Sequence, residues 1–176
     1  KKDGLSITCD VSATQLVLND NCLEEFDSNY KVQPPIRIEN DRKVLINSIL
    51  NGKIDVVCSD HAPQNIENKA CEFQSASYGM IGIQTLYSLL NTKLKGEISS
   101  EVLVEKLAIN PRNILGMELP EIEVGKPANL TFFDPTIEWE YNTKNNLSKS
   151  ENSPFLGEKF TGKVVGVVNN GEVIVG

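Results

Sequence analysis

A helical pattern that runs directly into a short apolar strand constrains the fold of this chain more than any other feature. The helical pattern is "NDRKVLINSILNG" (40–52), where apolar residues are spaced to lie along one face. "KIDVVCSD" (53–60) follows at once, and its continuous apolar run is typical of a strand buried on both faces. A helix that leads into a buried strand predicts a parallel sheet covered by helices, which is an α/β fold. The apolar residues assigned to the helix face are Val44, Leu45, Ile49 and Leu50.

Further α/β elements are expected on both sides of this pair. "LSITCDVS" (5–12) is rich in β-branched residues and predicts a strand. Asn110-Pro111 is expected to end the last helix, because a residue that precedes proline is disfavoured in the helical conformation. In chain order, we expect a strand over 5–12, a loop over 61–79, a helix over 81–94 and a helix over 99–109.

After about residue 120 the pattern changes from helices to strands. "GKPANLTFFDP" (125–135) predicts a turn and then a strand that Asp134-Pro135 stops. Residues 142–153 are polar and predict a solvated loop, and "GKVVGVVNNGEVIVG" (162–176) predicts a hairpin around Asn170-Gly171. We therefore predict two parts, an α/β part at 1–120 and a β-rich tail at 121–176.

Charge and composition exclude some classes of function. The net charge of −7 does not suit a nucleic-acid surface, which needs clustered Lys and Arg. No apolar run approaches the roughly 20 residues that cross a bilayer, so we expect no membrane partner. The four cysteines show no metal-binding spacing, which favours a reducing cytoplasm. Because the chain opens on Lys1 and not on methionine, we expect a piece of a longer chain.

The strand at 53–60 ends in a pair of residues that can carry chemistry, Asp60-His61, and His61 is the only histidine. A carboxylate at the C-terminal edge of a parallel sheet can bind a divalent metal or act as a general base. The alternative is structural: Asp60 caps the loop, and His61 bonds to the backbone. Because side chains alternate along a strand, we expect the two residues to face different ways.

Six motifs together resemble one family. In this order along the chain, they are similar to the C-terminal part of a dihydroorotase, a cyclic amidohydrolase of pyrimidine biosynthesis. The resemblance runs from about residue 5 to the end. The motifs are "NYKVQPPIR" (29–37), "IDVVCSDHAPQ" (54–64), "YGMIGIQT" (78–85), "AINPRNILG" (108–116), "GKPANLTFFDP" (125–135) and "NSPFLGEKFTGKVVGVVNNGEVIVG" (152–176).

The resemblance implies a fold and a reaction. The fold is the C-terminal portion of a TIM-like (β/α)8 barrel followed by strands of a small β-sandwich. The reaction is the reversible cyclisation of N-carbamoyl-L-aspartate to dihydroorotate, with zinc as cofactor. Asp60 takes the place of the family's metal ligand and proton shuttle, so it is the catalytic and metal residue that we expect. Arg37 matches the family's "PPLR". The substrate-side positions fall on Gln33, Gln64 and Gly79.

Four positions depart from the family's pattern. Thr14 and Gln15 stand where the family has two adjacent histidines, one of which binds zinc, and a hydroxyl or an amide is a far poorer zinc ligand. Gln33 and Gln64 replace an Asn and a His that contact substrate in the family. The family's other metal ligands, which lie in its N-terminal half, are absent from this sequence.

These departures leave three hypotheses open. The first is an active dihydroorotase whose remaining ligands lie elsewhere. The second is an inactive dihydroorotase-like scaffold that partners aspartate carbamoyltransferase, since members of the family occur in such complexes. The third is another cyclic amidohydrolase of the hydantoinase or allantoinase type. In each case half a barrel leaves open sheet edges, so we expect the remaining half or a second copy to complete it.

Overall fold

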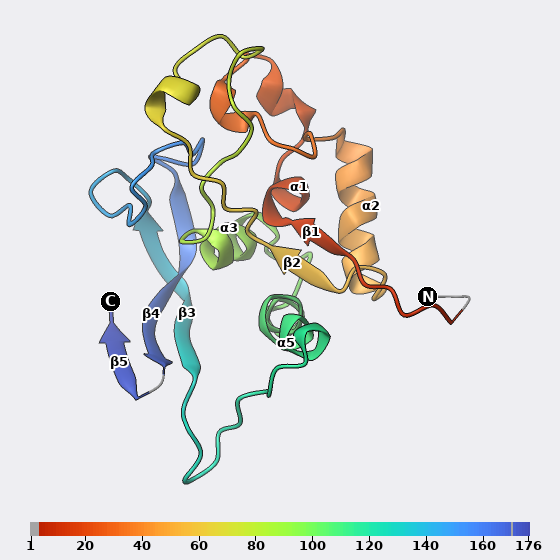
Figure 1. Ribbon diagram of the computed structural model, residues 1–176, viewed down its shortest axis with the longest axis vertical. Coiled ribbons are helices and arrows are strands. Elements are labelled where there is room, and N and C mark those ends of the chain that lie inside the picture. The colour runs from red at the N-terminus through yellow and green to blue at the C-terminus, as the bar shows by residue number, and fades with distance from the viewer. Residues whose placement is uncertain (1–3, 170) are drawn as a thin grey trace.

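The computed structural model describes residues 4–169 and 171–176, and it contains two small sheets with helices around and between them (Figure 1). None of the helices in this described part combines the length and the apolar composition that crossing a membrane requires. The elements are β1 (Asp10–Ser12), α1 (Ala13–Val17), η1 (Asp20–Leu23), η2 (Ser28–Tyr30), α2 (Glu39–Leu50), β2 (Val56–Cys58), η3 (Ile66–Asn68), α3 (Leu86–Lys93), α4 (Ser100–Val104), η4 (Glu105–Ile109), α5 (Asn110–Leu115), β3 (Leu130–Glu140), β4 (Lys159–Asn169) and β5 (Glu172–Val175).

The parallel pairing predicted around α2 is confirmed. β1 and β2 lie side by side in parallel, with Asp10 opposite Val56 and Ser12 opposite Cys58. The strand predicted over 5–12 was wrong for its first half, because strand structure begins at Asp10 and Leu5 is 63% exposed. β-branched residues favour a strand only where a neighbouring strand pairs with them.

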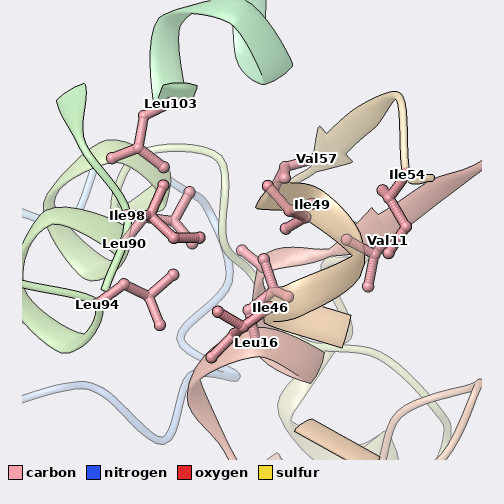
Figure 2. Packing of buried hydrophobic residues seen from close by; sticks show 11 residues of the cluster. Val11, Leu16, Ile46, Ile49, Ile54, Val57, Leu90, Leu94, Ile98 and Leu103 are labelled. Carbon is pink, nitrogen blue, oxygen red and sulfur yellow. The ribbon is translucent and has the colours of Figure 1, made fainter. Parts of the chain in front are cut away.

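The helix α2 packs on a face that overlaps only in part with the predicted one, since Ile49 is in the core and Leu45 packs against it. Ile46 and Ile49 are 4% and 2% exposed, whereas Val44 is 62% exposed. Figure 2 shows both isoleucines within the buried cluster that also holds residues of β1, β2 and α3. Spacing alone did not distinguish overlapping apolar faces, and contact with the sheet decides between them. The assignment was therefore right for Ile49 and wrong for Val44 and Leu50, which is 50% exposed.

The helix α3 lies between the two sheets and belongs to two cores (Figure 1). Leu90 and Leu94 are buried in the cluster around α2, while Leu89 is buried in a second cluster. That second cluster contains Tyr141 and Phe160 of the tail. The two parts of the chain therefore share one helix, and the division at residue 120 stays a prediction.

One of two element ends predicted at a proline was wrong. The helix expected over 99–109 does end at Ile109, and α5 follows directly from Asn110, with Pro111 in its first turn, where the missing N–H is not needed. β3 continues through Asp134-Pro135, because a register shift between Asp134 and Glu138 accommodates the residue that cannot donate. A proline is tolerated wherever the backbone donor it lacks would have no partner.

The C-terminal hairpin is confirmed. β4 and β5 are antiparallel, with Asn169 opposite Glu172, and Gly171 has a φ of +83°. Asn170, the other residue of the predicted turn, lies outside the described residues. β3, β4 and β5 together form the small antiparallel sheet of the tail.

Candidate functional site

Asp60 lies just beyond the C-terminal end of β2, at the edge of the parallel sheet where β1 leads into α1. Its backbone has a φ of +49°, a left-handed conformation that is uncommon outside glycine and that Asp tolerates better than most residues. The side chain of Asp60 is exposed. This edge is where α/β barrels place their reactive groups.

A hollow of about 530 Å³ lies beside this turn. It is bordered by both strands, by α2 and by the segment that leads into α2, so its walls come from several parts of the chain. We call it the Asp60 hollow; its polar border includes Asp10, Gln15, Arg37, Asp41, Cys58 and Asp60. Arg37 donates to the carboxylate of Asp41 over 3.0 Å, so the cation and one of the acids are paired within it.

His61 faces away from the Asp60 hollow, as the alternation of side chains predicts. It borders a separate hollow of about 300 Å³ on the side of the tail. Its Nδ1 accepts hydrogen bonds from the backbone N–H groups of Gly82 and Ile83, over 3.1 and 3.4 Å. In the neutral ring the proton is therefore on Nε2. His61 therefore bonds to the backbone, as expected if its role is structural.

Thr14 and Gln15, which stand at the family's histidine positions, are buried and engaged in hydrogen bonds. The Thr14 hydroxyl oxygen lies 2.9 Å from that of Ser12. The Gln15 amide donates to the carbonyls of Pro34 and Pro35, over 2.9 and 3.1 Å. Gln15 therefore holds the 33–37 segment against the start of α1. Its amide nitrogen is committed to the fold.

The residues present do not fit a zinc site by themselves. Within residues 4–169 and 171–176, no three His, Cys, Asp or Glu side chains are grouped so that they could hold a metal. A zinc site needs three or four such ligands, and Asp60 is not grouped with two others among the described residues that could complete one. Any metal at this edge would need ligands that these residues do not supply.

A family model described as the amidohydrolase family matches residues 6–174. This chain belongs to the amidohydrolase family. A curated dihydroorotase from Aquifex aeolicus is 40% identical to this amidohydrolase over 176 residues, which are 99% of this chain and 41% of that protein. The chain thus spans about 41% of the length of this relative.

Solved structures confirm the predicted fold, the C-terminal portion of a TIM-like barrel followed by strands of a small β-sandwich. In this chain those strands form the antiparallel sheet β3–β4–β5. An L-hydantoinase (dihydropyrimidinase) from Arthrobacter aurescens superposes with a TM-score of 0.90 at 27% identity, over 99% of this chain and 40% of that chain. An inactive dihydroorotase-like domain of a Chaetomium thermophilum CAD-like multifunctional protein gives a TM-score of 0.70 at 21% identity, over 98% of this chain and 44% of that chain. The second likeness concerns the fold alone.

The predicted substrate-side residues of this amidohydrolase are not all gathered at the Asp60 hollow. Gln33 is exposed on the segment that Gln15 holds. Gln64 borders another hollow, where its side-chain amide donates to the carbonyl of Tyr78 over 3.0 Å. Gly79 is buried next to Gln64. The substrate roles of Gln33, Gln64 and Gly79 stay predictions.

Two features of the structure require glycine at position 79, its positive φ and the close approach of Ala62. Its φ is +124°, and a Cβ there would lie 2.7 Å from the Cβ of Ala62 and 2.8 Å from the Ala62 carbonyl oxygen. Its own carbonyl accepts from the buried ammonium of Lys69 over 3.0 Å. Burial lowers the pKa of Lys69 from its usual value. The segment that begins at Gly79 is therefore fixed tightly against the loop that follows Asp60.

Two residues of this support were missed by sequence reasoning. Gly82 lies so close to Ser59 that a Cβ would be 2.9 Å from the Ser59 carbonyl oxygen. Asn152, at 5% exposure, reaches the loop after Asp60 from the segment predicted to be a solvated loop. Both residues lie inside quoted motifs, "YGMIGIQT" and "NSPFLGEKF", but no local pattern indicates what they contact.

Cys58 borders the Asp60 hollow, and the pKa of its thiol is raised. Burial raises the pKa of its thiol to about 11, and the bond from its Sγ to the Asp10 carboxylate over 3.3 Å and the charges of Asp10 and Asp60 act in the same direction. The folded protein therefore keeps this proton between pH 9 and about 11, where an ordinary thiol loses it. Its contribution to the free energy of unfolding is present below pH 9 and is lost as the pH rises to about 11.

At pH 8, Cys71 should react with iodoacetamide at least about ten times faster than Cys58, because the thiolate is the reactive form. Cys71 is exposed, and both cysteines are unpaired. The folded protein would be labelled for several different times and then digested. Mass spectrometry of the peptides that contain Cys58 and Cys71 would measure both labelling rates. The ratio of the two labelling rates should fall as the pH rises from 9 to 11. Equal labelling rates at pH 8 would contradict the raised pKa of Cys58.

Proposed function

We propose that this amidohydrolase chain is part of a dihydroorotase, which interconverts N-carbamoyl-L-aspartate and dihydroorotate in pyrimidine biosynthesis. One observation carries the proposal: the 40% identity to the Aquifex aeolicus dihydroorotase extends over 99% of the chain. Identity to the L-hydantoinase over the same span is 27%. The unpaired cysteines support a cytoplasmic location for the enzyme.

Asp60 is the residue that we propose for proton transfer. In ring opening, water attacks the amide carbonyl carbon, and the C–N bond then breaks. Asp60 would accept the proton of the attacking water and return it to the leaving nitrogen, and ring closure reverses both transfers. Its position supports this role, because it lies at the C-terminal sheet edge and borders a hollow of about 530 Å³.

The proposed function also requires zinc and further zinc ligands. The described residues do not supply those ligands. The chain spans about 41% of its dihydroorotase relative, so a further part of the enzyme would provide the remaining ligands and close the barrel. Asp60 would then be this chain's contribution to the metal site.

An inactive, dihydroorotase-like scaffold is the second candidate, and Gln15 favours it. Its amide is bound to the carbonyls of Pro34 and Pro35, at one of the two positions where the family has adjacent histidines, one of which binds zinc. The proposed partner of such a scaffold is aspartate carbamoyltransferase. A solved relative in a CAD-like multifunctional protein is described as an inactive dihydroorotase-like domain, and its fold alone is shared with this chain.

A substrate panel on the protein at its natural length tests these alternatives. A dihydroorotase should prefer dihydroorotate over hydantoin and dihydrouracil by about 10²-fold or more in kcat/KM, because a site that binds the ring carboxylate discriminates against rings without it. Turnover should require zinc, which elemental analysis would quantify. A preference for hydantoin would indicate the hydantoinase alternative. No turnover and no zinc, together with co-elution with aspartate carbamoyltransferase, would indicate the scaffold.

A further inference from the structure

The turn that carries Asp60 is held from outside by a single side chain of the tail. Asn152 is 5% exposed, and its Nδ2 donates to the carbonyls of Ala62 and Gly79 over 3.0 and 3.2 Å. Its Oδ1 accepts from the backbone N–H of Gln64 over 3.1 Å. The amide therefore uses both of its ends on the backbone around the turn.

The backbone of Asn152 extends the same support. Its carbonyl accepts from the N–H of Ile81 over 3.0 Å. The segment 79–83 is in turn fastened to the Asp60 turn, because the N–H of Ala62 donates to the carbonyl of Met80 over 2.9 Å. Gly82 packs against Ser59, which directly precedes Asp60. Asn152 thus ties the 61–64 loop to the segment 79–83.

This support matters because Asp60 does not hold its own conformation. A left-handed φ at a non-glycine residue persists only when the surrounding structure determines it. Ser59 and residues 61–64 are the chain on either side of Asp60, and residues 79–83 and Asn152 make the contacts to them just described. Loss of the amide donor at Asn152 would release the Ala62 carbonyl and would leave the Gly79 carbonyl bound to Lys69 alone.

We propose that Asn152 is a positioning residue for Asp60, acting through the 61–64 loop; this inference rests on the proton-transfer role given to Asp60 in the proposed function. In this proposal the tail contributes to the site by positioning Asp60. Displacing a proton-transfer group by a fraction of an ångström affects the transition state more than substrate binding. The effect of losing Asn152 should consequently appear in kcat.

The test compares two substitutions of the same chemistry in the protein at its natural length. Asn152→Asp keeps the size of the side chain but replaces the donor by an acceptor. Asn91→Asp is the matched control, because Asn91 also donates to two carbonyls, those of Pro135 and Thr161, and joins α3 to the tail sheet. Asn91 makes none of the contacts to the Asp60 turn described above.

We expect Asn152→Asp to lower kcat for dihydroorotate by about 10- to 100-fold with KM changed less than about threefold. Hydrogen exchange of peptides covering 59–64 should become faster. Asn91→Asp should leave kcat within about twofold and the exchange of these peptides unchanged. Should Asn152→Asp fail to fold, Asn152→Ser retains one hydroxyl donor and should show the same pattern with a smaller fall.

Some results would overturn the inference. Equal losses of kcat in both variants would show a general effect of tail docking, and unchanged kcat or unchanged exchange in Asn152→Asp would remove the positioning role. Failure of the proposed function is distinguishable, because the wild-type protein would then turn over no cyclic amide. Hydrogen exchange of residues 59–64 would still test the role of Asn152 in that case. Faster exchange in Asn152→Asp but not in Asn91→Asp would support its role in holding the turn, and any other pattern would reject that role.

Discussion

Asp60→Asn should lower turnover of dihydroorotate by about 10²- to 10⁴-fold, which is the range that general acid–base catalysis supplies. An amide in place of the carboxylate keeps the size of the side chain but cannot accept a proton at neutral pH. The turn should survive the change, because Asn tolerates the left-handed conformation at a φ of +49° as well as Asp does. Steady-state kinetics on the natural-length protein would measure the loss.

Asp20→Asn is a suitable control for this substitution. Asp20 is an exposed carboxylate in η1, and we expect kcat/KM within about twofold of the wild type. Thermal unfolding of both variants would show that neither has lost its fold. Wild-type turnover in a folded Asp60→Asn protein would end the case for Asp60 as the proton-transfer residue.

Gly79→Ala should lower the free energy of unfolding by about 3 kcal/mol, because strain and overpacking act together. The new Cβ would lie 2.7 Å from the Cβ of Ala62, at a φ of +124° that side chains rarely adopt. The segment has little freedom to move away, since the Gly79 N–H donates to the Lys31 carbonyl over 2.9 Å and its carbonyl accepts from Lys69. Urea unfolding followed by circular dichroism would measure the change.

Gly96→Ala separates the conformational part of this loss from the steric part. Gly96 also has a positive φ, +82°, but nothing lies within 4 Å of a Cβ placed there. We expect a loss of about 1 kcal/mol, the ordinary cost of a left-handed conformation. Equal losses at Gly79 and Gly96 would mean that the approach of Ala62 relaxes without consequence.

Local patterns predicted the parts of the fold that neighbouring residues determine. The run from α2 into β2 gave the parallel pairing, and the Asn170-Gly171 pattern gave the β4–β5 hairpin. Asp60 could be placed at the sheet edge because a strand and its direction are local properties. Its left-handed turn was not predictable, since that conformation depends on contacts with 79–83.

The errors arose where a distant partner changed the outcome. The helix predicted from residue 81 begins at Leu86. The segment before it pairs with distant parts of the chain, since the N–H of Ile81 donates to the Asn152 carbonyl and that of Gly82 to His61 Nδ1. Asn152 is polar and lies in a polar stretch, so its burial could not be read from composition. A side chain that satisfies buried backbone groups of another segment leaves no periodic signal.

The long separation between the Asp60 turn and Asn152 also sets an order of events during synthesis. The bond from Asn152 to Ala62 joins residues 90 positions apart. At a translation rate of about 5–20 residues per second, the loop after Asp60 waits roughly 5 to 20 seconds on the ribosome for this partner. The strand β2 can pair with β1 long before that. The loop after Asp60 thus reaches its final shape later than the strand pair that carries it.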